Sequence, residues 1–221
     1  MNDILSYLEA LTQKLRQVFG ERLRYVGLQG SYLRGEAGPD SDLDVVVVIA
    51  KLSMEDLAQY RQVIQSLPYA DRSCGFLCGQ EELASWNPLE ICNLLHATRD
   101  YYGCLQELVP AYCREDAVNY CKFSLNALYH ELCHSYVHAE EAAMEAVLPG
   151  CYKMAFFILQ NLYYLQTGYF AESKVELLKR LDGKDKEVLQ RHLDQEMPWQ
   201  LSRDAALLFS WCQEQMCRKS L

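Results

Sequence analysis

The sequence predicts an α+β protein in which an N-terminal α/β domain with a mixed sheet precedes a C-terminal helical bundle. Three observations lead to this fold class. Strand-like and helix-like segments alternate in the first half of the chain, whereas only helical patterns follow from about residue 111. The 221 residues, half of them apolar, are enough for two small domains with their own cores. We therefore expect domains at residues 1–108 and 109–221.

Apolar spacing and turn residues define the elements of the first half. They predict helices over 3–19, from 53 to about 67 and over about 80–97, and strands over 23–28, 44–49 and 72–78. Gly20 closes the first helix, and Ser53 is an N-cap with Asp56 three residues later. Gly75 weakens the third strand, because glycine has no side chain to pack.

The second half has helical patterns throughout. Prolines and glycines divide it into helices over 114–146, 150–167, 172–194 and 203–219. The dividing positions are Pro149–Gly150, Thr167–Gly168 and Met197–Pro198. Four helices in succession predict a bundle.

Charge and composition restrict the classes of partner. A net charge of −9 argues against extended nucleic acid bound by a broad basic surface, but it leaves room for a nucleotide held locally. The longest apolar stretches fall short of a membrane span, and the N-terminus is an amphipathic segment rather than a signal peptide. The ten cysteines form no CxxC pair. We therefore expect reduced, buried thiols in a cytoplasmic protein that has no membrane partner.

One group of residues has the spacing expected of a functional site. Gly30 and Ser31 follow the first strand, ten residues intervene, and Asp42 and Asp44 open the second strand. Alternation directs both carboxylates to one face, where they repel each other unless a cation compensates them. Mg²⁺ prefers such oxygen ligands and leaves positions for phosphate oxygens. Glycine permits close backbone approach, and the serine amide and hydroxyl can donate to a phosphate, so the pattern predicts a metal–triphosphate site.

The stretch GSYLRGEAGPDSDLDVVVV resembles the signature of the polymerase-β-like nucleotidyltransferase superfamily, including the aminoglycoside adenylyltransferases and small bacterial nucleotidyltransferases. The resemblance implies that Asp42 and Asp44 hold Mg²⁺ and that Gly30 and Ser31 bind nucleotide phosphates. It also implies transfer of NMP, with AMP from ATP as the first choice, to an acceptor hydroxyl with loss of pyrophosphate. We assign Arg34 to the nucleotide-binding set. Asp40 is outside the signature, and a turn after proline explains it.

The resemblance extends into the second half. Residues 151–174, CYKMAFFILQNLYYLQTGYFAESK, are similar to the C-terminal helices of aminoglycoside adenylyltransferases. That similarity implies that Lys174 approaches the nucleotide phosphates; the alternative is an exposed lysine in the first turn of a helix.

The pattern departs from the superfamily at a third carboxylate, which a later strand usually supplies. Cys74 occupies the best-aligned position, and Asp71 could substitute if the strand begins earlier. Otherwise a carboxylate arrives from the helical domain, or the enzyme is impaired. A catalytically weak nucleotide-binding or antitoxin-like module is therefore the alternative function.

A second alternative is a zinc hydrolase, because HELCH at residues 130–134 matches H-E-x-x-H on a predicted helix. His138 continues the same face, but two helical turns, roughly 12 Å, separate it from His130, too far for one ion. We expect this face to line the cleft opposite the metal site, with Glu131 as an acceptor-orienting base. The acceptor is then a small molecule such as an aminoglycoside, or a protein hydroxyl, and a homodimer is compatible with the sequence.

Overall fold

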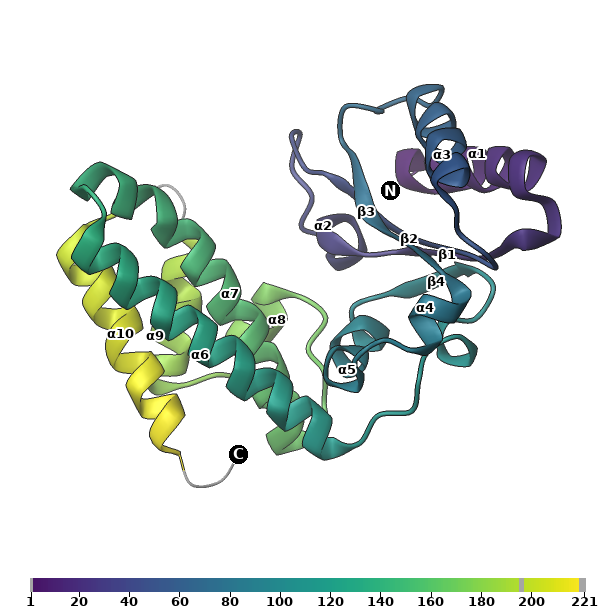
Figure 1. The fold of residues 1–221 in the computed structure, drawn as a ribbon. Coiled ribbons are helices and arrows are strands. Elements are labelled where there is room, and N and C mark those ends of the chain that lie inside the picture. Colours follow the sequence, from purple (N-terminus) through teal and green to yellow (C-terminus); the bar gives the residue numbers. More distant parts are fainter. Residues whose placement is uncertain (1, 195–196, 219–221) are drawn as a thin grey trace. The chain divides into compact units, whose positions relative to one another are not determined.

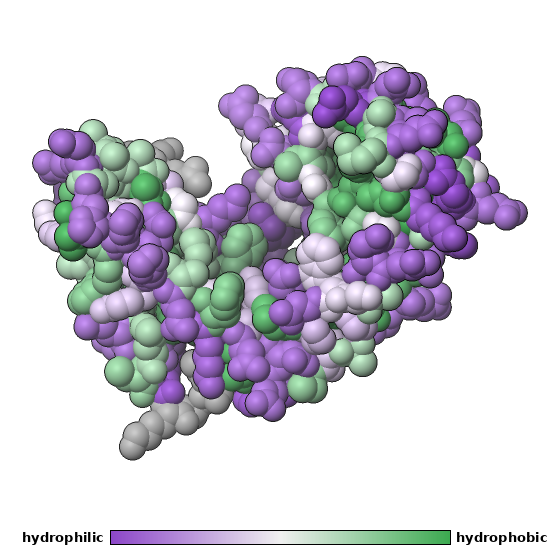
Figure 2. Space-filling model, viewed as in Figure 1, coloured by the Kyte–Doolittle hydropathy of each residue, from purple (hydrophilic) through white to green (hydrophobic). Residues whose placement is uncertain are grey.

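A computed structural model describes residues 2–194 and 197–218 of the protein (Figure 1). The chain divides into two compact units, Met1–Tyr112 and Cys113–Leu221. On the face drawn in Figure 2, the surface of each unit is a mixture of hydrophilic residues (purple) and apolar residues (green).

A four-stranded mixed sheet forms the centre of the first unit, within the residues that the structure describes. Its strand order is β3-β2-β1-β4. β1 (Leu23–Leu28) pairs antiparallel with both β2 (Leu43–Ile49) and β4 (Arg99–Tyr102), and β3 (Ser73–Gly79) pairs parallel with β2. The parallel pair needs a crossover, and α3 (Met54–Gln65) lies in it. The mixed sheet and the helical second unit confirm the α+β prediction.

The β-branched run of β2 is buried on both faces of the sheet, which explains why it is continuously apolar. Val45 and Val47 pack with α1 (Asn2–Phe19) and α3 in one hydrophobic cluster. Val46 and Val48 face the opposite way and pack in a second cluster with Tyr25 and Leu83. Because side chains alternate along β2, Asp44 belongs to the face of Val46 and Val48.

The capped helix of the first unit confirms one prediction made from local sequence. Ser53 Oγ accepts a hydrogen bond from the Asp56 amide, and the Asp56 carboxylate accepts one from the Ser53 amide. This reciprocal capping box fixes the start of α3.

Other details of the first unit differ from the prediction. The predicted turn after β1 is a short helix, α2 (Gly30–Arg34). The single helix expected over 80–97 is two, α4 (Gln80–Ala84) and α5 (Pro88–His96), because the Asn87 side chain caps α5 and a proline occupies its first position. β4 was not predicted. Single-turn 3₁₀ helices η1 (Gly20–Arg22) and η2 (Leu105–Glu107) complete the unit.

The second unit consists of helices throughout its described part. These are α6 (Arg114–His138), α7 (Glu141–Thr167), α8 (Lys174–Leu178), α9 (Gly183–Leu193) and α10 (Leu201–Cys217). The predicted break at Pro149 is wrong, because α7 continues through it. Buried side chains on both sides of the proline, Leu148 and Cys151 among them, hold the helix against the core despite the lost backbone hydrogen bond.

The helix predicted over 172–194 is also wrong as a single element. Ser173 caps α8, which ends at Leu178, and Gly183, the first residue of α9, has a left-handed φ of 53° that a continuous helix would not contain. The end predicted for the last helix, residue 219, lies outside the described residues.

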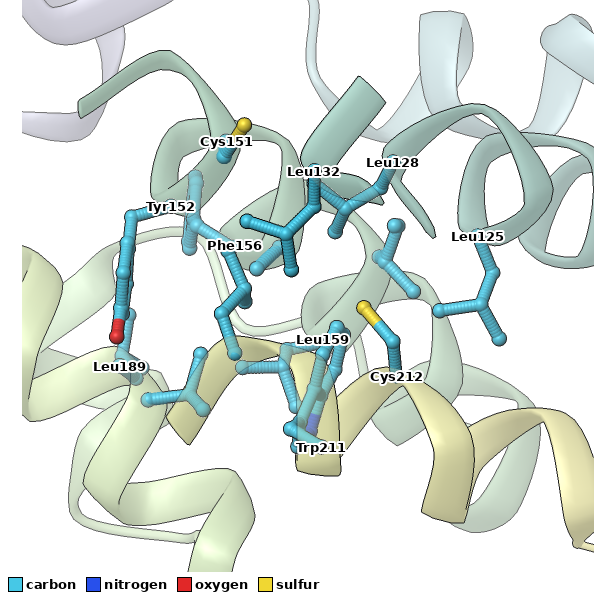
Figure 3. Packing of buried hydrophobic residues seen from close by; sticks show 14 of the residues in the cluster. Leu125, Leu128, Leu132, Cys151, Tyr152, Phe156, Leu159, Leu189, Trp211 and Cys212 are labelled. Atoms are coloured by element: carbon cyan, nitrogen blue, oxygen red, sulfur yellow. The ribbon is translucent and has the colours of Figure 1, made fainter. Parts of the chain in front are cut away.

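The core of the second unit is shown in Figure 3. Leucines of α6, aromatic residues of α7 and Trp211 of α10 meet there and are almost completely buried. The Trp211 indole N–H donates to Asp185 Oδ1 at 2.7 Å, which satisfies its polar atom.

By length and composition alone, α7 could cross a membrane, contrary to the prediction that every apolar stretch falls short of a span. An 18-residue window of α7 has a mean hydropathy of 1.4, and 44% of that window is buried inside the protein. The core contacts of α7 account for much of its apolar character.

Candidate active site

Gly30 lies directly against the carboxylate of Asp44. The Gln29 amide donates to the Asp44 carbonyl at 2.9 Å, so the chain passes from β1 into α2 immediately beside the start of β2. A Cβ atom at position 30 would lie 2.7 Å from Asp44 Cγ and closer still to Oδ2. Gly30 also has a φ of 71°, a conformation that side chains disfavour. Only glycine allows this approach of backbone to carboxylate.

The two aspartates differ in exposure. Asp44 is half-buried within β2, whereas Asp42 is exposed and precedes the strand by one residue. The Leu43 amide donates to the Arg72 carbonyl at 2.8 Å, which continues the β2–β3 ladder to the end of the strand. Alternation about the buried Leu43 therefore leads us to expect both carboxylates on one face.

A thiol occupies the position beside Asp44. The parallel register pairs Asp44 with Cys74 of β3, and the Cys74 side chain is exposed and forms no disulfide. The strand position expected to carry a third carboxylate therefore holds a cysteine.

Asp71 does not fulfil the condition under which it could replace that carboxylate. It is exposed in a turn, and β3 begins at Ser73 rather than earlier. The Ser73 hydroxyl lies 2.7 Å from the Tyr7 hydroxyl of α1, so alternation would send Asp71 toward the α1 face as well. The role assigned to Asp71 stays a prediction that the strand geometry does not favour.

Two other acids of the first unit, Glu82 and Asp100, have contacts elsewhere. Glu82 lies against Gly79, five residues along β3 from Cys74, which corresponds to roughly 17 Å. Asp100 accepts a hydrogen bond from the Tyr25 hydroxyl at 2.6 Å, and burial together with that bond raises the pKa of the Tyr25 phenol. Within the described residues, no group of three or more His, Cys, Asp or Glu side chains could hold a metal ion.

The remaining nucleotide-binding candidates of the first unit lie in α2. Ser31 is half-buried in its first turn, and its carbonyl accepts from the Glu36 amide at 2.9 Å. Arg34 lies in the last turn, and its Nε pairs with Glu36 Oε2 at 2.9 Å. Glu36 thus orients the guanidinium and the end of the helix together.

Two predicted site residues belong to the second unit. Lys174 is the first residue of α8, half-buried, with its Nζ 5.6 Å from the centre of the Phe156 ring. Glu131 lies on α6 and accepts from the Ser135 hydroxyl at 2.7 Å. Their predicted roles beside the nucleotide stay predictions.

The histidines of the HELCH motif form a ladder on α6. His130, His134 and His138 are exposed, with successive ring centres 5.8 Å and 4.9 Å apart. A hydrolytic zinc site needs three protein ligands. Since the described part of the chain offers no such group, the ladder lacks the ligand set that a zinc hydrolase requires.

Sequence reasoning missed two residues that shape the site. The Gln29 side chain donates to Thr98 Oγ1 at 2.7 Å and thereby joins the turn before α2 to the start of β4. Arg72 Nη1 donates to the Pro39 carbonyl in the loop that leads to Asp42. Both contacts depend on strand pairing, so no local signal indicated them.

Sequence similarity to known proteins identifies the family of the chain. The family model of the nucleotidyltransferase domain matches residues 8–72, which include the turn and both aspartates. Among curated relatives, the protein adenylyltransferase MntA of Thermococcus cleftensis is 37% identical over 71 residues, which cover 30% of this chain and 70% of that protein. The chain therefore belongs to the nucleotidyltransferase family and is an enzyme of this kind.

A solved structure has the same fold over almost the whole chain. It is the spectinomycin adenyltransferase AAD(9) from Enterococcus faecialis with ATP and spectinomycin. The TM-score is 0.60 at 14% sequence identity, and the match covers 97% of this chain and 99% of the other. At this identity, the similarity shows a shared fold, an α/β unit followed by a helical one.

Proposed function

We propose that the protein transfers AMP from ATP to a hydroxyl group of an acceptor in a Mg²⁺-dependent reaction. The observation that carries this proposal is the contact between Gly30 and the Asp44 carboxylate. It brings the turn that we expect to bind phosphates and the strand that carries an expected metal ligand to one point of the sheet. A nucleotide bound there would have its phosphates beside the carboxylate pair.

The donor set fits Mg²⁺. Asp42 and Asp44 supply hard carboxylate oxygens, and Mg²⁺ is commonly held by one or two carboxylates together with substrate phosphates. A third acid on β3 is therefore not required to bind the ion. The ion, when bound, would neutralise charge that develops on the phosphate oxygens.

The residues of this chain then have separate roles. The Gly30 and Ser31 backbone and the Ser31 hydroxyl would orient the phosphates, with Arg34 and Lys174 as cations that offset their charge. The acceptor oxygen attacks the α-phosphorus, the bond to pyrophosphate breaks, and the acceptor proton passes to a base. Asp71 and Glu131 are the candidates for that base.

Two classes of acceptor are supported by different relatives. The spectinomycin adenyltransferase shares the fold over 97% of this chain, which supports a hydroxyl-bearing small molecule such as an aminoglycoside. MntA is a protein adenylyltransferase and shares sequence over 30% of this chain, which supports a protein hydroxyl as the second candidate. We place the small molecule first, because the helical unit is part of the shared architecture.

The test uses ATP labelled at the α-phosphate with panels of aminoglycosides and proteins. Wild type should transfer label and release pyrophosphate, and Asp42→Asn or Asp44→Asn should reduce transfer by more than about 100-fold. Asp40→Asn is the matched control, since this exposed neighbour has no assigned role. Transfer that survives in both site variants would refute the proposal, and Mg·ATP binding without transfer to any acceptor would favour the catalytically weak module.

A further inference from the structure

Arg72 contacts the chain on both sides of Asp42. Its carbonyl accepts from the Leu43 amide at 2.8 Å, and its Nη1 donates to the Pro39 carbonyl at 2.5 Å. Pro39 precedes Asp42 by three residues and Leu43 follows it directly. One residue of the neighbouring strand end thus holds both flanks of the segment that carries a predicted metal ligand.

The guanidinium is itself held in place. Its Cζ lies 4.6 Å from the centre of the Tyr69 ring, and the Arg72 amide donates to the Tyr69 carbonyl at 3.0 Å. Tyr69 has a φ of 62°, which is uncommon for a residue other than glycine. A planar, stacked guanidinium loses little freedom when it forms its hydrogen bond, whereas a lysine ammonium would lack the stacking plane.

Two hydrogen bonds between Gly38 and Ser41 close the turn that precedes Asp42. The Gly38 amide donates to Ser41 Oγ at 2.9 Å, and the Ser41 amide donates to the Gly38 carbonyl at 3.2 Å. These bonds shape the turn but do not attach it to the sheet. The Arg72 side chain attaches the segment on the Pro39 side, and the Arg72 main chain attaches it on the Leu43 side.

We propose that Arg72 is a positioning residue for the metal ligand Asp42. Its side chain keeps the loop at residues 38–42 against β3, so that the exposed Asp42 carboxylate is preorganised beside Asp44. The inference rests on the proposed function, since it assumes that these carboxylates hold Mg²⁺. Removal of the side chain should loosen the Asp42 side of the site and leave the Asp44 side, which is anchored in β2, unchanged.

The first measurement does not depend on activity. Hydrogen exchange of the peptide covering residues 38–43 should accelerate at least about 10-fold in Arg72→Ala, with an intermediate effect in Arg72→Lys. Arg61→Ala, which removes an exposed arginine of α3, is the matched control and should exchange like wild type. Unchanged exchange in Arg72→Ala would overturn the proposal.

The second measurement separates positioning from general loss of structure. The Mg²⁺ concentration for half-maximal ATP binding should rise about 10-fold or more in Arg72→Ala, as for residues that orient metal ligands. At saturating Mg²⁺, ATP affinity should return toward wild type, because the bound ion can reorder the loop. A deficit that persists at saturating Mg²⁺ would indicate a structural role only and would overturn the proposal.

Failure of the proposed function and failure of the Arg72 proposal give different results. If wild type binds no ATP, the proposed function fails while the exchange measurement still reports on the loop. If Arg72→Ala does not fold, the comparison of Arg72→Lys with wild type decides, because lysine keeps the charge and can donate a hydrogen bond but has no planar guanidinium to lie over the Tyr69 ring.

Discussion

Replacement of Gly30 by alanine tests the central contact of the site. The added Cβ would lie 2.7 Å from Asp44 Cγ, whereas carbon atoms in contact are normally separated by about 3.5 Å or more. The carboxyl group must therefore move by about 1 Å, and a displacement of that size can reduce catalysis by about 100-fold. We expect Mg·ATP binding to weaken and AMP transfer to fall by roughly this factor.

The backbone contributes separately, since alanine at a φ of 71° costs about 1–2 kcal/mol of stability. Gly35→Ala provides the matched control, because Gly35 has a φ of 68° and no atom lies within 4 Å of a Cβ built on it. Both variants should therefore lose similar stability in urea unfolding, but only Gly30→Ala should lose Mg·ATP binding by calorimetry. Equal Mg·ATP affinity in the two variants would refute the role of this contact.

Further outcomes follow from individual contacts. The Arg22 guanidinium lowers the pKa of Asp56 to about 2, so this pair should stabilise the fold fully above about pH 4 and lose its effect as the pH falls toward 2. Urea unfolding of wild type and Asp56→Asn should then converge in acid, and a constant difference would contradict the assignment. Asp204→Ala should cost about 3 kcal/mol, because it leaves the buried Arg191 without the carboxylate that it contacts at 3.0 Å, and urea midpoints measure this loss. Cys74→Glu should lower the Mg²⁺ requirement of ATP binding by adding an acid beside the aspartate pair, and an unchanged or higher requirement would show that this strand position does not face the ion.

The sequence predicted those parts of the fold whose signals are local. The valine run of β2 and the Ser53 capping box are specified by neighbouring residues, and both were placed correctly. β4 was missed because its four residues, RDYY, show no apolar alternation and are largely exposed. They become a strand by pairing with β1, which is a contact between distant parts of the chain.

The predicted helix boundaries in the second unit were wrong for a related reason. Proline is the strongest local sign of a helix end, yet α7 continues through Pro149 because its neighbours are buried on the core side. Conversely, α6 ends at His138 without a proline or glycine. Burial in the assembled unit decides such boundaries, and the local sequence carries little of that information.

In the candidate site, too, some residues could be predicted from local sequence, whereas others depend on contacts between distant parts of the chain. Gly30, Asp42 and Asp44 could be identified from their spacing, whereas the contacts of Gln29 and Arg72 required the strand register. Cys74 is a case between these two. The sequence predicted its place on the strand, but its position beside Asp44 follows only from the parallel pairing of β2 and β3.

The ten-residue spacing between Ser31 and Asp42 has a structural explanation. The chain leaves β1 at Gln29 and must return to the sheet as β2. It returns in such a way that the Gln29 amide donates to the Asp44 carbonyl. α2 uses the first residues of this excursion, and the 38–41 turn reverses the chain just before Asp42. Closing such a loop costs entropy, which the contacts of Glu36 with α2 and of Arg72 with Pro39 help to offset. The spacing is therefore the length of chain needed to bring the Gly30–Ser31 turn back against the start of β2, where Asp44 lies.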